Sequence, residues 1–333
     1  MNMCTQCGRQ SPIPQKGTLF IFGKLEINLP FLVPGPKHTY LCTYESHEQI
    51  INYISTIQSY DSSHSLRVGI STDASTLPLI NHSLEELKTR VQHYDVITYI
   101  QDGDFTSFLQ PIVDLTENEI YGFEHLLRPL GNADLSPGIL FSTAQKAGMQ
   151  STLDQRAREE AIKARAQHIK PPLKSFINFL PSSIYNPEYC LRHTFEIVER
   201  YEVDPSSLVF EVVETEKITD VPHLKHVLDV YKQNGMQVAL DDVGSGYATL
   251  DMLYKLQPNY VKIDRQYIQD CHENMEKQKF LTSVIDIASN LNIKVLGEGI
   301  EKKEEFEYCQ EAGMDFAQGY YLGKPSPTPQ LER

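Results

Sequence analysis

The sequence predicts an α/β fold: a (β/α)8, TIM-like barrel with an antiparallel first strand, preceded by a small α+β N-terminal domain. Strand-like and helix-like segments alternate regularly from about residue 104 onward. Only Leu115–Glu119 joins the first two predicted strands, and a parallel pair would need a longer crossover. The first 95 residues lack this alternation and mix helical with extended patterns.

We expect four parts: an N-terminal domain (1–95) of sensory or regulatory role, a connector (96–103), the barrel (104–325) and a tail (326–333). The predicted barrel strands are Ser107–Asp114, Ile120–Leu127, Ser175–Phe179, Leu208–Glu214, Gln237–Asp242, Tyr260–Asp264, Ile293–Glu298 and Phe316–Leu322. The predicted helices between them include Leu153–His168, His223–Asn234, Gln278–Leu291 and Glu304–Ala312. A doubly wound open sheet is the alternative, but no glycine-rich phosphate loop follows the first strand.

In the N-terminal domain, residues 48–60 have helical spacing and residues 66–71 resemble a short strand. Ser83 and Glu86 have capping-box spacing, so a helix should begin there and carry apolar residues as far as Tyr94. This helix either packs on its own domain or forms a connector that pairs with a second protomer. The pattern is too short to indicate a coiled coil, which favours the first interpretation.

Charge and composition narrow the functional class. The 333 residues contain 44 Asp and Glu against 30 Lys and Arg, a formal net charge of −14, which argues against wrapping duplex nucleic acid. The chain has no apolar run of about 18 residues and no secretion signal, so we expect no membrane span. Six scattered cysteines are typical of a reducing compartment, and we expect a cytoplasmic protein.

Polar side chains gather at the ends of the predicted strands. They are Glu124, Asn178, Glu211, Glu214, Asp241, Asp242, Lys262, Asp264, Glu298, Glu301 and Gln318. Barrel strands open onto one face at their C-terminal ends, so these residues should converge there. Clustered carboxylates repel one another unless a divalent cation is bound, and oxygen ligands favour Mg²⁺ or Mn²⁺. The ligands suffice for two ions bridged by Asp241, an arrangement suited to phosphodiester hydrolysis.

Each of these residues taken alone has a structural explanation. A single Glu at a strand end is usually a surface residue, and a lone Lys on an apolar strand usually reaches the solvent. Acidic residues at five successive strand ends are difficult to explain as independent accidents. The pattern as a whole therefore favours a functional site.

Eight segments in order resemble the EAL family of cyclic di-GMP phosphodiesterases over about residues 104–325. They read FLQPIVDL, YGFEHLLRP, INFLPSS, VFEVVETE, ALDDVGSGYATL, VKID, LGEGIE and AQGYYLGKP. The resemblance implies hydrolysis of cyclic di-GMP to linear 5′-pGpG, in which water attacks phosphorus and the 3′ oxygen leaves. It also implies a homodimer. Two alternatives stay open: a catalytically weak or inactive receptor of cyclic di-GMP, and a hydrolase of another phosphodiester.

The resemblance also implies a role for each matching residue. Metal ligands would be Glu124, Asn178, Glu211 and Asp241 for one ion and Asp241 and Asp242 for the other. Catalytic residues would be Glu298, Lys262 and Asp242, and substrate-binding residues would be Gln110, Arg128, Asp264, Glu301 and Gln318. Glu214 would stabilise the loop Val243–Thr249 that positions the two aspartates.

This sequence departs from the family pattern at four positions. His125 replaces the usual Ala, Val213 the usual Thr, and Val243 and Ser245 the usual Phe and Thr. Strand alternation turns residue 125 away from Glu124, so we expect His125 to pack rather than bind metal. The expected metal ligands are intact, so the sequence predicts an active domain.

The N-terminus carries one further motif. Cys4 and Cys7 have the spacing of a zinc knuckle, and His38 and Cys42 are the best candidates for a second pair of ligands in a structural zinc site. A redox-active pair is less favoured, since no thioredoxin-like strand precedes it. The simplest alternative is a pair of cysteines without a specific role.

Overall fold

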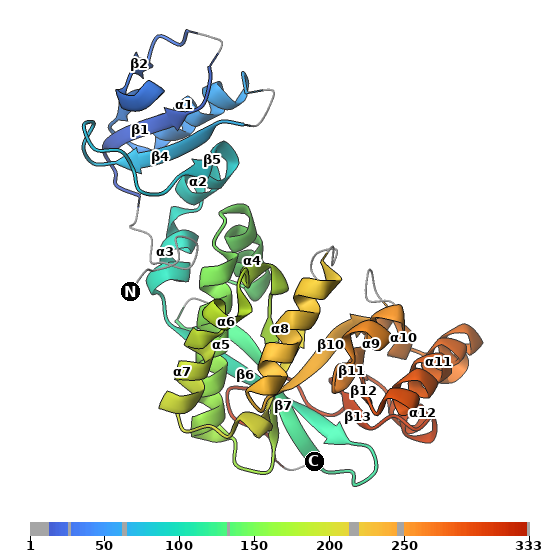
Figure 1. The fold of residues 1–333 in the computed structure, drawn as a ribbon. Coiled ribbons are helices and arrows are strands. Elements are labelled where there is room, and N and C mark those ends of the chain that lie inside the picture. The colour runs from blue at the N-terminus through green and yellow to red at the C-terminus, as the bar shows by residue number, and fades with distance from the viewer. Residues whose placement is uncertain are drawn as a thin grey trace. The chain divides into compact units, whose positions relative to one another are not determined.

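In the computed structural model, the described residues are 13–25, 28–61, 65–131, 134–212, 220–244 and 250–331. The chain divides into two compact units, one of residues 1–104 and 129–153 and the other of residues 105–128 and 154–333 (Figure 1). Residues 129–153 therefore group with the N-terminal unit, although they lie within the range predicted for the barrel. The predicted domain boundaries stay a prediction.

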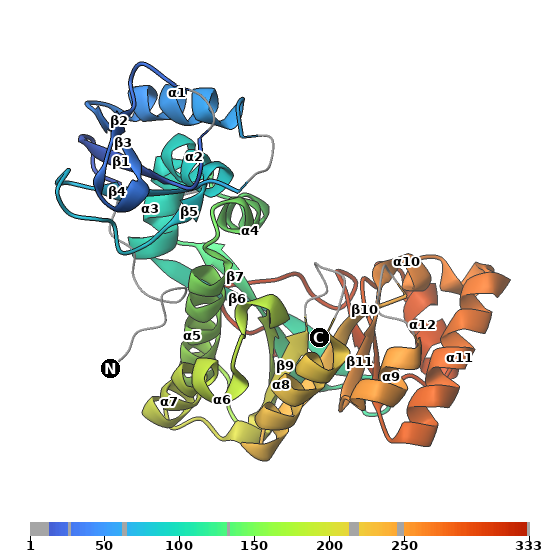
Figure 2. The same ribbon diagram turned by 45° about the horizontal axis from the view of Figure 1, so that its top comes forward.

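The first unit is built on an antiparallel sheet with strand order β2-β3-β1-β4-β5. Its strands are β1 (Gly17–Phe22), β2 (Val33–Pro34), β3 (Tyr40–Tyr44), β4 (Arg67–Ser71) and β5 (His82–Ser83), with a 3-10 turn, η1 (Pro36–His38), between β2 and β3. Helix α1 (His47–Gln58) lies along the sheet (Figure 2). It buries Ile50, Ile54 and Ile57 against strand residues such as Leu19 and Val68.

The capping box predicted for the next helix is present. The Ser83 hydroxyl accepts a hydrogen bond from the Glu86 backbone N–H at 3.1 Å, and the Glu86 carboxylate accepts one from the Ser83 N–H at 2.6 Å. Helix α2 (Leu84–Gln92) buries Leu87 and Val91 in the core of its own unit, as the first interpretation predicted.

The predicted extension of this helix to Tyr94 is wrong. The backbone of His93 leaves the helical region at φ −110° and ψ 39°, and α3 (Tyr94–Asp102) begins after it. Helix α4 (Pro137–Lys146) also belongs to this unit. The buried guanidinium of Arg90 on α2 donates to the Ala147 carbonyl at 2.7 Å and so binds the C-terminal end of α4.

The second unit is a closed barrel with strand order β10-β11-β12-β13-β6-β7-β8-β9. Its strands are β6 (Phe105–Asp114), β7 (Ile120–Pro129), β8 (Lys174–Phe179), β9 (Leu208–Val212), β10 (Gln237–Val243), β11 (Tyr260–Ile263), β12 (Lys294–Gly297) and β13 (Phe316–Gln318). Neighbouring strands are parallel from β7 through β13, while β6 runs antiparallel to β13. The predicted barrel and its antiparallel first strand are confirmed.

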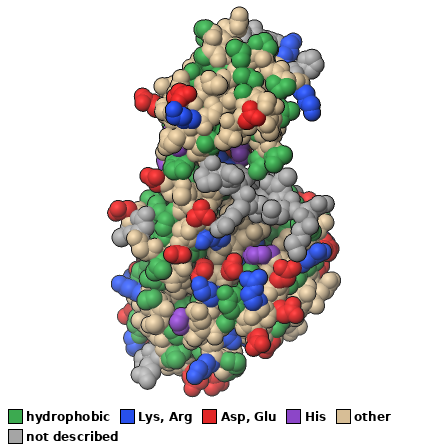
Figure 3. Space-filling model, turned by 90° about the vertical axis from the view of Figure 1, so that its left-hand side faces the viewer, with side chains coloured by type: hydrophobic (Ala, Val, Ile, Leu, Met, Phe, Trp, Pro, Cys, Tyr) green, Lys and Arg blue, Asp and Glu red, His purple; other side chains and the backbone are tan. Residues whose placement is uncertain are grey.

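Helices surround the barrel and bury its outward-facing side chains (Figures 1 and 2). They are α5 (Gln150–His168), α6 (Pro187–Cys190), α7 (Arg192–Arg200), α8 (Val221–Gln233), α9 (Leu250–Leu256), α10 (Arg265–Ile268), α11 (Met275–Leu291) and α12 (Lys303–Glu311), with short 3-10 turns η2 (Pro181–Ser183), η3 (Pro205–Ser207) and η4 (Cys271–Glu273). The described helices include none long and apolar enough to cross a bilayer. On the face in Figure 3, acidic and basic side chains are interspersed over the barrel.

Side chains alternate along each strand, so every second one points into the barrel. These interior side chains form two layers. The first layer is apolar and comprises Ile112, Phe176, Val209, Ala239, Tyr260, Leu296 and Phe316. Two residues farther along the parallel strands stand Asn178, Glu211, Asp241, Lys262, Glu298 and Gln318. The predicted strand-end residues therefore form the next layer above a packed apolar floor.

Candidate active site

Four carboxylates surround one buried ammonium group. Lys262 projects from β11 with 1% of its side chain exposed. Its Nζ lies 2.7 Å from Glu298, 3.0 Å from Glu211, 3.2 Å from Asp241 and 3.8 Å from Glu124. These residues come from β7, β9, β10, β11 and the segment that follows β12, and the closed barrel brings them together.

Two amides hold Glu124 in place. Asn178 Nδ2 donates to Glu124 Oε1 at 2.9 Å, and Gln318 Nε2 donates to Oε2 at 2.7 Å. Asn178 faces Glu211 in the register of β8 and β9. The four residues expected to hold the first metal, Glu124, Asn178, Glu211 and Asp241, are therefore neighbours.

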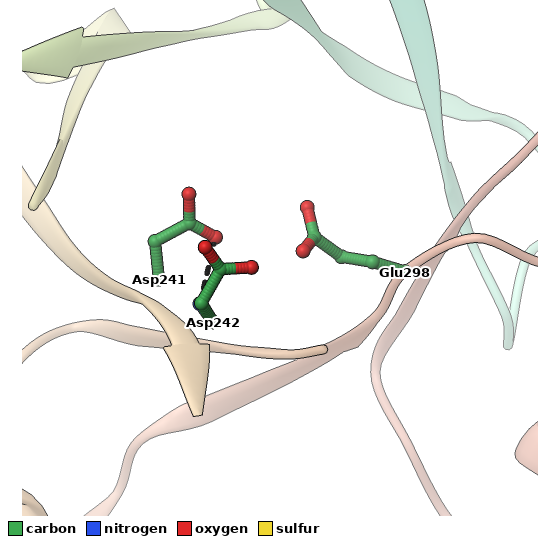
Figure 4. A group of neighbouring side chains, drawn as sticks. All are labelled: Asp241, Asp242 and Glu298. Carbon is green, nitrogen blue, oxygen red and sulfur yellow. Dashed lines mark hydrogen bonds between the residues drawn. The ribbon is translucent and has the colours of Figure 1, made fainter. Parts of the chain in front are cut away.

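Asp241 and Asp242 both contribute to the site although they are adjacent in sequence. Neighbouring residues of a regular strand point to opposite faces. Here the register of β10 shifts between Leu240 and Val243, and Asp242 has a positive φ of 53°. One oxygen each from Asp241, Asp242 and Glu298 lie within 4.8 Å of one another, and their carboxylates face a common space (Figure 4).

The site carries more negative charge than Lys262 compensates. Burial raises the pKa of Glu211, Asp241 and Glu298 above their ordinary values, against the opposing effect of Lys262. Burial and the nearby Asp241 raise the pKa of Asp242 to about 7. Burial alone would lower the pKa of Lys262, but the surrounding carboxylates raise it well above its usual range.

These residues fit divalent cations. Glu211 is fully buried, and neither of its carboxylate oxygens has a hydrogen-bond donor of acceptable geometry among the described residues, although Lys262 lies nearby. Buried carboxylates without donors are costly unless a cation pairs with them. The set consists of carboxylates and one amide oxygen, the ligands that Mg²⁺ and Mn²⁺ prefer.

Arg128, Asp264 and Gln110, which were predicted to bind substrate, each contact other residues of the barrel unit. Arg128 is half-buried, and its Cζ lies over the Phe108 ring, 5.4 Å from the ring centroid. Burial lowers the pKa of its guanidinium, and the charge of Glu124 opposes this effect. Asp264 caps α10 and shares a hydrogen bond with Asp242. Gln110 donates to the Gly323 carbonyl at 3.4 Å.

Glu301 forms an ion pair with Arg265 at 2.8 Å. Glu214 and residues 245–249 of the loop it was predicted to stabilise lie outside the described residues, as do Val213 and Ser245. The roles predicted for all of these residues stay predictions.

His125 is buried on the face of β7 opposite Glu124. Its Nδ1 lies 3.1 Å from the Ser107 hydroxyl, and burial lowers its pKa to about 3. A neutral ring held there packs in the wall of the barrel.

The candidate zinc ligands lie in the N-terminal unit. Cys4 and Cys7 lie outside the described residues, and the side chain of His38 is not described. Cys42 packs in the core of the sheet, where burial raises its thiol pKa to about 12. Zinc binding requires a thiolate, so any coordination by Cys42 would have to overcome this burial.

Asp154, which is not among the predicted site residues, holds one segment of the site in place. Asp154 on α5 accepts the Leu180 backbone N–H at 2.9 Å and the Ser183 hydroxyl at 2.8 Å, which fixes the turn after Asn178. Its partner Arg158 lies one turn away at 2.8 Å. The spacing of these two charges among apolar residues of a predicted helix was the available signal.

Comparison with known proteins identifies the family. The EAL domain pattern matches residues 95–325. A probable cyclic di-GMP phosphodiesterase of Escherichia coli, PdeG, is 33% identical over 68% of this chain and 45% of its own length. The cyclic di-GMP phosphodiesterase PA2567 of Pseudomonas aeruginosa is 30% identical over 67% of this chain and 38% of its own length. The chain thus spans less than half the length of these relatives.

Solved structures resemble this one. A standalone versatile EAL protein from Vibrio cholerae, in its c-di-GMP bound form, has a TM-score of 0.63 and 37% identity over 69% of this chain and 97% of that chain. A calcium and cyclic di-GMP complex of Klebsiella pneumoniae BlrP1 has a TM-score of 0.61 and 21% identity. That likeness covers 93% of this chain and 96% of that chain, so its fold also matches part of the N-terminal region. The barrel and its cluster of polar side chains agree with the EAL domain match over residues 95–325, and the chain belongs to the EAL domain family.

Proposed function

We propose that this chain hydrolyses cyclic di-GMP to linear 5′-pGpG with two bound Mg²⁺ or Mn²⁺ ions. The observation that carries the proposal is the buried cluster of Glu124, Glu211, Asp241 and Glu298 around Lys262. The family supports it, since relatives that cover the same region are named cyclic di-GMP phosphodiesterases.

The ligand assignment follows the placement of the side chains. Glu124, Asn178, Glu211 and Asp241 would hold one ion, and Asp241 with Asp242 the other. The ions would supply positive charge that promotes ionisation of water and offsets the charge developing on the phosphodiester.

The remaining residues orient the reactants. Glu298 accepts the proton of the attacking water or holds that water in place, and Lys262 orients the water and stabilises negative charge. A P–O bond to water forms as the bond to the 3′ oxygen breaks. Arg128 binds a phosphate through its guanidinium, and Gln110, Asp264, Glu301 and Gln318 line the binding site. Glu214 stabilises the loop after β10.

The test incubates the purified protein with cyclic di-GMP and Mg²⁺ or Mn²⁺. Turnover to pGpG that is lost with EDTA and in Glu124→Ala supports the proposal. Tight binding without turnover would indicate a receptor instead. Activity on a generic diester, with none on cyclic di-GMP, would indicate a different hydrolase.

Two further variants separate binding from chemistry. Glu298→Ala should lose most of kcat and retain substrate binding, because Glu298 acts on water. Arg128→Ala should mainly weaken substrate binding. Unchanged affinity in Arg128→Ala would reject the role proposed for the guanidinium.

The N-terminal unit is proposed to modulate this activity, and the protein is proposed to act as a homodimer. A structural zinc site at Cys4, Cys7, His38 and Cys42 is proposed separately. Metal analysis of Cys4→Ser/Cys7→Ser tests the zinc site. Loss of bound zinc supports it, and unchanged zinc content rejects it.

A further inference from the structure

The loop between β12 and α12 carries Glu298 and Glu301, two residues of the candidate site. Its first half is fixed by the neighbouring strands. The Glu298 N–H donates to the Ile263 carbonyl at 3.1 Å, and the Ile300 N–H donates to the Gln318 carbonyl at 3.0 Å. The loop therefore lies between the ends of β11 and β13.

A sharp turn separates the two acidic residues. Gly299 has a φ of +69°, and a Cβ there would lie 2.5 Å from Cγ of Arg265. Only glycine adopts this conformation readily without such a clash. The turn sends the Glu301 side chain to Arg265 while Glu298 reaches Lys262.

One buried carboxylate fixes the second half of the loop. Glu305, in the first turn of α12, has 0% of its surface exposed. Its Oε2 accepts the backbone N–H groups of Glu301 at 2.9 Å and Lys302 at 3.1 Å. Its Oε1 accepts the N–H of Asp270 at 2.9 Å, from the turn between α10 and η4.

Glu305 accepts more hydrogen bonds than the capping of α12 requires. A carboxylate at the third helical position normally accepts only from the residue that caps the helix, here Lys302. Glu305 also joins the segment after β11 to the loop after β12. A buried carboxylate with three backbone donors is strongly held, and its removal would leave those donors unpaired.

We propose that Glu305 is a positioning residue that fixes the loop Glu298–Lys302, and with it the catalytic carboxylate of Glu298, against the segment that follows β11. This inference rests on the proposed function for the role of Glu298. The contact itself does not depend on that role.

The experiment compares Glu305→Ala, Glu305→Gln and a matched control. Asp315→Ala is the control, because Asp315 accepts the Val295 N–H at 2.8 Å and so holds the other end of β12, away from the site. Glu305→Ala should lower kcat for cyclic di-GMP at least roughly tenfold, with KM nearly unchanged. Glu305→Gln should recover most of kcat, because its amide oxygen still accepts from Glu301 and Lys302. Asp315→Ala should lower the melting temperature and leave kcat unchanged.

Hydrogen exchange of substrate-free protein gives a second readout. Amides of residues 298–302 should exchange roughly tenfold faster in Glu305→Ala and remain protected in Asp315→Ala. Equal kcat in Glu305→Ala and Asp315→Ala, or unchanged exchange in the loop, overturns the proposal. If the parent protein does not hydrolyse cyclic di-GMP, the proposed function fails, while the exchange result still decides whether Glu305 fixes the loop.

Discussion

The two interior layers of the barrel differ in how completely their polar and charged side chains find hydrogen-bond or charge partners. In the apolar layer that forms the floor, the Phe176 ring packs edge-on against the Tyr260 ring with 5.2 Å between centroids. The Tyr121 and Phe316 rings stack with 4.0 Å between centroids. The Tyr260 hydroxyl bonds the Tyr121 hydroxyl at 2.6 Å and Gln237 at 3.1 Å. In the layer above, four carboxylates share one ammonium group.

The difference separates stability from function within the same strands. Residues two positions apart on one strand, such as Tyr260 and Lys262 on β11, serve opposite purposes. The floor contributes packing and satisfied hydrogen bonds. The upper layer holds buried charge that favours cation binding at the expense of the metal-free fold. The variants Glu211→Gln, Phe176→Ala and Tyr260→Phe test this division between the two layers.

The largest effect is expected for Glu211→Gln. The change preserves shape but removes a charged ligand, so turnover should fall roughly 10³-fold or more. The melting temperature of the metal-free protein should be equal or higher, because a neutral amide replaces a fully buried carboxylate whose pKa is raised. Turnover and thermal unfolding in EDTA check both parts. A large loss of metal-free stability would show that Glu211 serves the fold.

Phe176→Ala should give the opposite result. The ring is fully buried, so its removal should lower the free energy of unfolding by about 3–5 kcal/mol. Well below the melting temperature, kcat should stay close to that of the parent protein, because the charged layer is untouched. Denaturant unfolding and turnover at low temperature measure the two quantities. A proportional loss of kcat would show that the layers do not act separately.

A smaller effect is expected from pH. The pKa of Asp242 is 3.8 ordinarily and about 7 in the folded protein, so the folded state binds its proton more tightly. Metal-free stability should therefore fall as pH rises from about 4 to about 7. Metal ions bind the deprotonated carboxylates, so Mg²⁺ should raise the melting temperature more at pH 8 than at pH 6. An equal rise of the melting temperature at pH 6 and pH 8 would contradict this.

The parts of the molecule differ in how well the sequence predicted them. Residues near strand ends, such as Glu211 and Glu298, were predictable because the barrel brings strand ends together. The family motifs then placed each one in order. In the N-terminal unit, apolar patterns predicted the strand near residues 66–71 and the helix over residues 48–60, but those patterns carried no chemistry. The end of α2 was missed because a change in the backbone at His93 leaves the apolar spacing intact.

Residues that act through backbone contacts were not predictable in the same way. Asp154 and Glu305 lie on helices, where acidic residues are common and usually exposed. Their importance depends on which N–H groups the fold places beside them, and those groups lie 26 residues away for Asp154 and 35 for the Asp270 N–H that Glu305 binds. Only the three-dimensional arrangement reveals such pairs.

The smallest effect is expected for Tyr260→Phe. The change keeps the ring, and with it the packing of the floor, but removes a hydroxyl that bonds Tyr121 and Gln237. Two partially buried polar groups lose a partner, so the free energy of unfolding should fall by about 1–2 kcal/mol. Lys262, two residues along β11, keeps its ion pairs, and kcat and metal affinity should be unchanged. Denaturant unfolding, turnover and metal titration of this variant measure the three quantities. Weaker metal binding in Tyr260→Phe would mean that the hydrogen bonds of the floor set the position of Lys262, and the two layers would then have to be treated as one structure.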